Sequence, residues 1–349
     1  MRMGSLSVTT ERHCVDTMKG MITMKKKLIT ALCIVGVLSF VLSGHGSPAF
    51  AWEPSGKVDV MLLSGAGSGT DIYMRTLLDA AAKYNLCTQP MPISYKNDGG
   101  GMVGILQISQ ITNPRQANHN LVAWTSGSIM TAARNSPLRM KDFTPIAVMV
   151  NDTGFLARSS ACKFKDFNAA IEAARNGERV VVGTGKDDYL ISMEQMLDKL
   201  GLSRDQMSYI PYDSATQTMG TLLGGHVDFA LTTANIALEY IKTGQVIPEF
   251  VLAEKRLGGV MAEVPTFSEY TGGKYGHVLL NIWRGVAAPK AMSAEAKAYW
   301  CDVFKAISEK PEWINYCDKF VVENLALTGE AAAEFMRRSE ESFLATIKK

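Results

Sequence analysis

The sequence has few of the residues on which enzymes and metal sites most often depend. It contains five histidines and six cysteines among 349 residues, and no HExxH, GxSxG or CxxC pattern occurs. Beyond residue 51 the histidines are His119, His226 and His277, isolated from one another in the sequence. We therefore expect a protein that is not an enzyme, with no cofactor and with no catalytic or metal-binding residues.

Long apolar runs and repeats are also scarce. After residue 51 no segment approaches the roughly 18–20 apolar residues that a membrane helix needs. Low-complexity segments and repeats of fixed period are absent, which argues against a disordered or solenoid protein. With 47% hydrophobic residues in 349, the chain has enough apolar material for a core, and its length suggests two lobes or domains.

The first 51 residues have the three parts of a secretory signal peptide. Lys25 to Lys27 precede the apolar run Leu28 to Leu42, and a polar stretch then ends in Ala49 to Ala51. The pattern predicts a leader over residues 1–51, translation from Met21 or Met24, cleavage after Ala51 and a periplasmic location. A retained membrane anchor is the alternative, but the apolar run is short for a bilayer span.

The slight positive charge of the whole chain comes from this leader. The full sequence has 36 basic and 34 acidic residues. Without residues 1–51 it has 30 basic and 32 acidic residues, a net charge of −2. No basic block remains that could neutralise many phosphates, so nucleic-acid binding is not expected.

Four cysteines follow the leader. They are Cys87, Cys162, Cys301 and Cys317, and an oxidising compartment would permit disulfides. Cys301 and Cys317 lie in two helical segments separated near Pro311 and form the better candidate pair. Buried free thiols are the alternative. The spacing of the four does not match a zinc site.

Short strands, glycine-containing turns and helices alternate along the chain. Residues 57–63 predict a strand, 64–71 a turn, and the segment that follows a helix with Thr70 or Asp71 at its N-cap. The same order recurs three times, at 92–104, 120–128 and 179–200. This alternation predicts an α/β protein with mostly parallel sheets flanked by helices.

The pattern restarts near residue 150, and we expect two lobes. Residues 52–150 together with 276–349 form lobe I, and residues 151–275 form lobe II. Residues 282–288 are expected in a strand or loop, and two C-terminal helices are expected to close the chain.

Two turns are candidate anion sites. Gly65 to Asp71 and Gly183 to Asp188 each follow a strand and open a helix. Such turns direct unpaired N–H groups and the positive end of a helix dipole to the crevice at the strand ends. One turn from each lobe could hold a carboxylate without a cationic side chain. Plain strand–helix connections are the alternative. A dinucleotide site is not expected, because GAGSG lacks the last glycine of that fingerprint.

Five sequence motifs resemble those of a known protein family. They are Gly67 to Asp71 with Arg75, Asn97 to Gly104, Asp142 to Ala147, Pro211-Tyr212 followed by Leu222 to Phe229, and Val264 to Phe267 with Glu269, Trp283, Gly285 and Ala288-Pro289. In this order they resemble the substrate-binding proteins of tripartite tricarboxylate transporters, the Bug receptors, over nearly the whole chain after the leader.

The resemblance implies a two-lobed periplasmic-binding-protein fold, type II-like, that closes on its ligand. It also implies a monomer that delivers a small carboxylate, either a di- or tricarboxylate or an amino acid, to the membrane subunits of such a transporter. Receptors that feed a sensor kinase, and enzymes on the same fold, are the alternatives. The ligand-binding residues it suggests are Ser68, Gly69, Thr70, Asp71, Ser126, Ser128, Gly185, Lys186, Asp187, Asp188 and Thr233.

Two segments depart from the pattern of the family. Lys186 to Tyr189 stands where relatives usually have small neutral residues, and Asp213-Ser214 stands where they usually have a basic residue and glycine. Acidic groups near a cleft repel a second carboxylate unless they are paired, and they favour an amine. An amino-acid ligand therefore stands beside a di- or tricarboxylate.

Overall fold

The computed structural model describes residues 52–185 and 187–347, with side chains to residue 345. These residues belong to one unit, Trp52–Lys349. The predicted leader, its cleavage position and Lys186 lie outside the described residues. None of the described helices combines the length and the apolar character needed to cross a bilayer.

One lobe is built on strands β1, β2, β3, β9 and β10 and the first part of β4. Strands β1, β2 and β3 are parallel, whereas β9 runs antiparallel to β3. The strands are β1 Asp59–Leu62, β2 Ile93–Tyr95, β3 Asn120–Thr125, β4 Phe143–Ser159, β9 Asn281–Pro289 and β10 Glu323–Thr328. The helices around them are α2 Gly69–Lys83, α3 Met102–Ser109, α4 Pro114–Ala117, α5 Ser126–Asn135, η1 Met140–Asp142, α11 Ala294–Ile307, α12 Pro311–Phe320 and α13 Gly329–Ile347.

The other lobe is built on strands β5 to β8 and the last part of β4. Strand β5 pairs in parallel with β6 and β7, and β4 is antiparallel to both β7 and β8. The strands are β5 Val180–Thr184, β6 Met207–Pro211, β7 Phe229–Thr233 and β8 Val246–Val251. The helices are α6 Phe167–Arg175, α7 Asp188–Leu200, α8 Ala215–Leu223, α9 Ala234–Lys242, η2 Gly259–Met261 and α10 Phe267–Tyr270.

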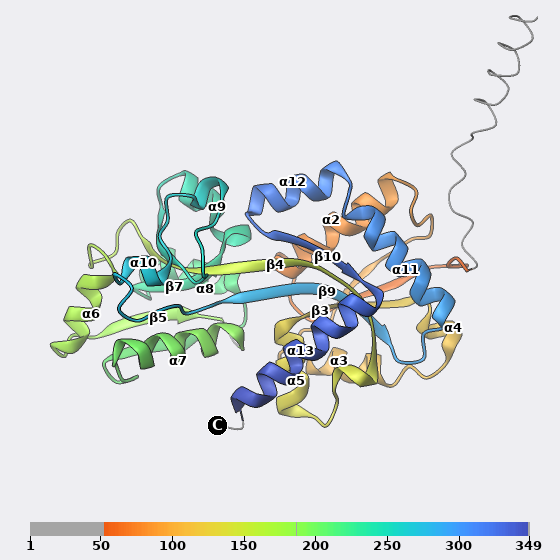
Figure 1. Cartoon of the computed structure of the whole chain (residues 1–349), viewed down its shortest axis with the longest axis horizontal. Helices are drawn as coiled ribbons and strands as arrows, with labels where there is room; N and C mark the ends of the chain where they lie inside the picture. Colours follow the sequence, from red (N-terminus) through yellow and green to blue (C-terminus); the bar gives the residue numbers. More distant parts are fainter. Residues whose placement is uncertain (1–51, 186, 348–349) are drawn as a thin grey trace, which may run out of the picture. The chain divides into compact units, whose positions relative to one another are not determined.

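Strand β4 connects the two lobes. Its residues from Phe143 to Thr153 pair with β9, and its residues from Gly154 onward pair with β7 and β8. Figure 1 shows β4 and β9 passing side by side from one half of the molecule to the other. The sheet order β2-β1-β3-β9-β4-β7-β5-β6 is therefore continuous. These two strands carry the sheet from one lobe to the other.

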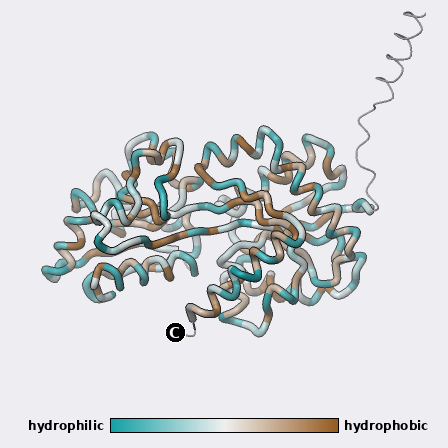
Figure 2. Tube along the Cα trace, viewed as in Figure 1, coloured by the Kyte–Doolittle hydropathy of each residue, from teal (hydrophilic) through white to brown (hydrophobic). Residues whose placement is uncertain are grey.

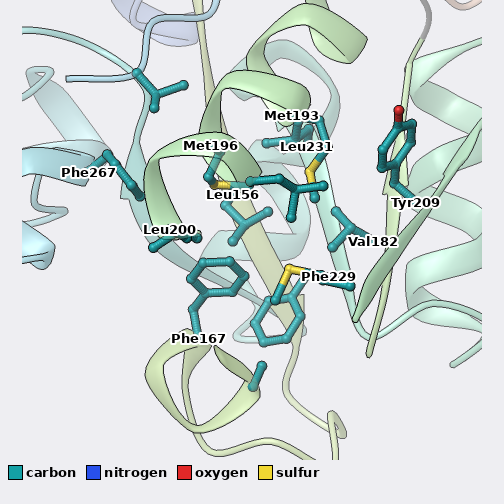
Figure 3. Close-up of a cluster of buried hydrophobic side chains, with 14 of the residues drawn as sticks. Leu156, Phe167, Val182, Met193, Met196, Leu200, Tyr209, Phe229, Leu231 and Phe267 are labelled. Atoms are coloured by element: carbon teal, nitrogen blue, oxygen red, sulfur yellow. The ribbon is translucent and has the colours of Figure 1, made fainter. Parts of the chain in front are cut away.

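The second lobe buries both faces of its sheet, and its strands show why. Val180 and Val182 lie in one apolar cluster while Val181 lies in the other, because successive side chains on a strand point to opposite faces. Along the chain trace, apolar stretches follow the central strands and hydrophilic ones follow the outer helices (Figure 2). Figure 3 shows the cluster that contains Val182, in which Phe167, Met196 and Phe229 also lie.

The predicted two-lobed α/β fold is confirmed, but the C-terminal part differs from the prediction. Three helices, α11, α12 and α13, follow β9, and β10 lies between the last two. The predicted pair of helices is therefore wrong. Helix α12 ends where Val321 adopts a left-handed conformation with φ 55°, and the short strand β10 then pairs with β4.

The four described cysteines are free thiols, so Cys301 and Cys317 form no disulfide and the alternative of buried thiols holds. The Cys301 thiol instead donates to the carbonyl oxygen of Ile146 at 3.4 Å. Burial raises the pKa of Cys317 to about 12, which keeps that thiol protonated and unreactive at neutral pH.

Gly285 in β9 is required by the pairing of β9 with β4. A Cβ at this position would lie 2.3 Å from the backbone oxygen of Ala147.

We expect Gly285→Ala to lower the free energy of unfolding by about 1–3 kcal/mol through overpacking, measured by urea denaturation. The control is Gly220→Ala on the exposed face of α8, where the added Cβ meets open space. It should be neutral or stabilising by up to about 1 kcal/mol. Equal stability of the two variants would show that β4 accommodates a side chain at position 285.

Candidate ligand-binding site

A cavity of about 190 Å³ lies at the carboxyl ends of the parallel strands, lined by residues of both lobes. Its volume corresponds to roughly six water molecules at about 30 Å³ each, which suits a small organic acid or amino acid. Of the residues suggested by sequence, the structure places eight on its wall: Ser68, Gly69, Thr70, Ser128, Gly185, Asp187, Asp188 and Thr233. Asp71 and Ser126 lie behind that wall, and Lys186 is outside the described residues.

The first lobe contributes the N-terminus of α2. Ser68 is the N-cap: its backbone is extended, and its Oγ accepts from the backbone N–H of Asp71 at 3.3 Å. The prediction of Thr70 or Asp71 as the cap is therefore wrong. The helix starts at Gly69 because the hydroxyl of Ser68 already satisfies a free N–H of the first turn. Thr70 is thus a helical residue whose side chain reaches the cavity.

Asp71 supports this turn from within the protein. It is 5% exposed, and its carboxylate accepts from the backbone N–H of Gly67 at 2.9 Å. It also accepts from the hydroxyl of Tyr95 at 2.9 Å and from Nε of Arg75 at 3.0 Å. All these partners belong to the first lobe, so Asp71 holds the loop before α2 in place.

Helix α5 brings a second N-terminus to the cavity. Thr125 and Ser128 form a capping box, in which each side chain accepts from the backbone N–H of the other residue. Ser126 is the first residue of the helix and donates from Oγ to Oδ2 of Asp188 at 2.6 Å. This hydrogen bond joins the two lobes.

The second lobe faces α5 with the loop between β5 and α7. Asp187 precedes α7 with a positive φ of 55°, and its carboxylate accepts from Nη1 of Arg134 at 3.1 Å. A third contact between the lobes runs from the hydroxyl of Thr216 to the backbone oxygen of Gly67 at 3.4 Å. The lobes therefore meet over the cavity through polar contacts.

The environment of Asp188 is unusual for a carboxylate. Burial raises its pKa to about 7; the hydrogen bond from Ser126 opposes this effect, Asp187 adds to it, and Arg284 opposes it. The residue is surrounded by protein but retains partial exposure, because it lines the cavity. Its carboxylate thus lies, partly buried, at the wall of a cavity that is partly open to solvent.

Arg284 on β9 is the main site residue that the sequence did not reveal. It is 6% exposed and lines the cavity, so the wall carries a cationic side chain that the sequence analysis did not single out. Its Nη2 donates to Oδ2 of Asp152 on β4 at 2.6 Å, and its Nη1 donates to Oγ1 of Thr70 at 3.1 Å. Its Nε is buried and has no hydrogen-bond partner among the described residues.

One feature of the sequence could have pointed to Arg284: the apolar segments that form β4 and β9 each contain a charged residue, Asp152 and Arg284. Asp152 pairs with Ile282 and Val150 pairs with Arg284, so the charged residues are diagonal neighbours on one face. The sequence alone does not show this register, because it depends on how β4 and β9 pair in the fold.

The same network reaches the second lobe. Nδ2 of Asn235 donates to Asp152 at 3.2 Å, and Oγ1 of Thr233 donates to Oδ1 of Asn235 at 2.7 Å. Gly69 makes room for it, because a Cβ there would lie 2.5 Å from Nδ2 of Asn235 and 2.9 Å from Nη2 of Arg284. The glycine of the first loop is therefore needed for packing against the ion pair.

Arg284 and Asp152 each favour the charged form of the other. Burial lowers the pKa of Arg284, but Asp152, Tyr316 and Tyr189 together raise it by more, and the net shift is upward. Burial raises the pKa of Asp152, and Arg284 opposes that shift. Removal of either partner would leave the other without its countercharge in a site that excludes water.

We expect Arg284→Gln to lower the free energy of unfolding by roughly 3–5 kcal/mol, because it leaves Asp152 buried and unpaired. Combining it with Asp152→Asn should recover part of that loss, measured as a coupling free energy in a urea double-mutant cycle. Lys57→Gln is the control: it breaks the exposed Lys57–Asp59 pair and should change stability by at most about 1 kcal/mol. Additive losses in the double variant would show that the pair is not coupled.

Comparisons with known proteins agree with this architecture. A UPF0065 protein in the gbd 5′ region of Cupriavidus necator is 25% identical over 290 residues, covering 81% of this chain and 84% of the relative. The malate-bound MatC of Rhodopseudomonas palustris superposes with a TM-score of 0.72 at 17% identity, covering 84% of this chain and 99% of MatC. An adipate-bound R. palustris protein gives 0.73 at 18% identity, covering 84% and 96%.

The periplasmic binding protein BugD also superposes with a TM-score of 0.73 at 19% identity, covering 84% of this chain and 97% of BugD. The two-lobed α/β architecture described above is therefore the periplasmic-binding-protein fold. The family described as tripartite tricarboxylate transporter family receptor matches residues 74–349. This chain belongs to that receptor family.

Proposed function

We propose that this chain is a periplasmic receptor that captures a small carboxylate between its lobes and delivers it to the membrane subunits of a tripartite tricarboxylate-type transporter. One observation carries the proposal: the N-termini of α2, α5 and α7 converge on one small cavity from both lobes. Family membership supports it, as do the malate and adipate bound by the two neighbours of the same fold.

The helix N-termini supply the groups that an anion needs. The first N–H groups of a helix have no partner within it, and the helix dipole places positive potential there. We propose that Ser68, Gly69 and Thr70 hold one face of the carboxylate, together with Ser128 and Thr233. Gly185 to Asp188 of the second lobe complete the site. Asp71 and Ser126 position the loops behind it.

Closure would assemble the site. We propose that lobe I, residues 52–150 with 276–349, and lobe II, residues 151–275, rotate about β4 and β9. The bonds Ser126–Asp188 and Arg134–Asp187 join the lobes and would break on opening. A ligand that contacts both lobes therefore favours the closed form, which is the form that a membrane partner would recognise.

We propose that the receptor is a monomer, is exported by a signal peptide cleaved after Ala51, and acts without catalysis. The described residues that line the cavity include no histidine and no cysteine. A general base or nucleophile would have to come from the aspartates and hydroxyls among these residues.

Filling the cavity should abolish binding without unfolding the protein. A side chain at Gly127 would start with ordinary contacts, the nearest at 3.6 Å, and Gly127 lines the cavity. We expect Gly127→Leu to weaken binding of any carboxylate that the wild type binds by at least 100-fold in isothermal titration calorimetry. Gly220→Leu is the matched control on the exposed face of α8 and should bind as the wild type does.

The panel for this titration is citrate, succinate, malate, adipate, aspartate and glutamate, and melting temperatures are measured for both variants. Failure of the wild type to bind any of these acids would contradict the proposed function. Equal binding by the wild type and Gly127→Leu would place the ligand elsewhere.

A further inference from the structure

A second recess, here called the back groove, lies on the opposite face of β4 and β9 from the cavity. Ile282 and Arg284 of β9 line the cavity, whereas Asn281 of the same strand lines the back groove. Successive side chains on a strand point to opposite faces. Thr153 of β4 is paired with Asn281 and also lines the back groove. The two strands that join the lobes therefore separate two recesses.

Both lobes contribute a wall to the back groove, which has a volume of about 930 Å³. The wall of lobe II is the loop after β8, residues 253–259. The wall of lobe I is the end of α12 with the start of β10, and it includes Asp318, Val321 and Glu323. Asp318, Glu323 and Asn281 are exposed, so the back groove is open to solvent and much of the two walls stands apart.

The two walls touch at Val321. This residue of lobe I packs against an apolar cluster of lobe II. A Cβ on Gly259 of the opposite wall would lie 3.4 Å from Cγ2 of Val321. The lobes are therefore in contact on this face of β4 and β9 as well as on the cavity face. A change in the angle between the lobes must change the separation of the walls.

Opening of the cavity and narrowing of the back groove are one motion. The opening proposed above separates the lobes on the cavity face, where Ser126 contacts Asp188, and bends β4 and β9 toward the other face. Because the back groove lies on that other face, its walls approach each other as the cavity opens. Any group that holds the walls apart therefore favours the closed form, and attraction between the walls favours the open form.

The two walls carry opposite charges. The charged residues that line them are Asp318 and Glu323 of lobe I and Glu254, Lys255 and Arg256 of lobe II. Two acids on one wall thus face two bases and one acid on the other. Arg256 is already paired with Glu269 at 3.0 Å. The attraction between Lys255 and the acids of lobe I grows as the walls approach, because Coulomb energy rises as the distance falls.

Building on the proposed function, we propose that the back groove controls lobe closure, and that Lys255, Asp318 and Glu323 set the affinity for the ligand without touching it. In the open form Lys255 approaches the two acids, and their attraction stabilises that form. Ligand binding has to offset this attraction. The affinity is therefore lower than the contacts in the cavity alone would give.

A bulky side chain on the floor of the back groove tests the mechanical part of this inference. Asn281→Trp places an indole ring between the walls and should keep them apart, which favours the closed form. The probe is the acid of the titration panel that the wild type binds most tightly, and we expect roughly tenfold tighter binding by calorimetry. The ligand-free variant should also have a smaller radius of gyration than the ligand-free wild type in small-angle X-ray scattering. Gly220→Trp on the exposed face of α8 is the matched control and should change neither quantity.

Charge reversal tests the electrostatic part. Lys255→Glu replaces attraction between the walls by repulsion and should tighten binding of the same acid by about two- to fivefold, as expected for exposed charges. Adding Asp318→Lys restores opposite charges across the back groove and should return the affinity toward that of the wild type. In about 1 M sodium chloride, where charges are screened within about 3 Å, Lys255→Glu and the wild type should bind equally. Lys165→Glu makes the same change in net charge at a side chain that is 81% exposed and should bind as the wild type does.

Each variant can contradict its own part of the inference while the carboxylate receptor stays intact. Unchanged or weaker binding by Asn281→Trp would overturn the role of the back groove, and the same result for Lys255→Glu would overturn the role of its charges. If no acid of the panel binds the wild type, the proposed function fails. The scattering comparison then still decides, since equal radii of gyration for ligand-free wild type and Asn281→Trp contradict the inference. Should Asn281→Trp not fold, Lys255→Glu decides, because Lys255 is exposed and its replacement leaves the core unchanged.

Discussion

The buried ion pair between Arg284 and Asp152 is the interaction on which the site depends. It joins the two strands that connect the lobes, and it lies directly beneath the first loop, whose Gly69 must lack a side chain to fit over it. The pair also holds Thr70 of one lobe and, through Asp152, Asn235 of the other. Such a pair adds little net stability over an apolar alternative, so its contribution is better understood as fixing the geometry of the cavity floor.

The sheet places the remaining groups. Parallel strands direct their following loops to one edge, and each loop opens a helix there, so free N–H groups gather at this edge in both lobes. Polar contacts join the two lobes beside the cavity, among them Ser126 with Asp188, Arg134 with Asp187, and Thr216 with Gly67. Contacts of this kind are compatible with opening, because water can replace them at low cost.

Local patterns were enough to predict most elements but not the centre of the site. Strand β1 lies within the strand predicted over residues 57–63, since its buried Val60 and Leu62 alternate with partly exposed residues ahead of the glycine-containing turn. Arg284 could not be recognised, because its meaning depends on the register of two strands that are far apart in the sequence. The N-cap of α2 was misplaced because Ser68, Thr70 and Asp71 are all good capping residues, and only the backbone conformation distinguishes them. The extra C-terminal helix was missed because a left-handed valine ends α12 where glycine is usual.

The acidic start of α7 distinguishes this cavity from one lined by helix N-termini alone. Helix N-termini attract any small carboxylate, and so they discriminate poorly between acids. Selectivity is a difference between affinities, and it grows when the site also disfavours the wrong ligand. Asp188 adds an acidic group to the cavity wall, and burial raises the pKa of its carboxyl group to about 7. The same carboxylate accepts a hydrogen bond from Ser126 of the other lobe at 2.6 Å. The protonation state of Asp188 therefore affects both the contact between the lobes and the charge that a bound acid meets at the wall.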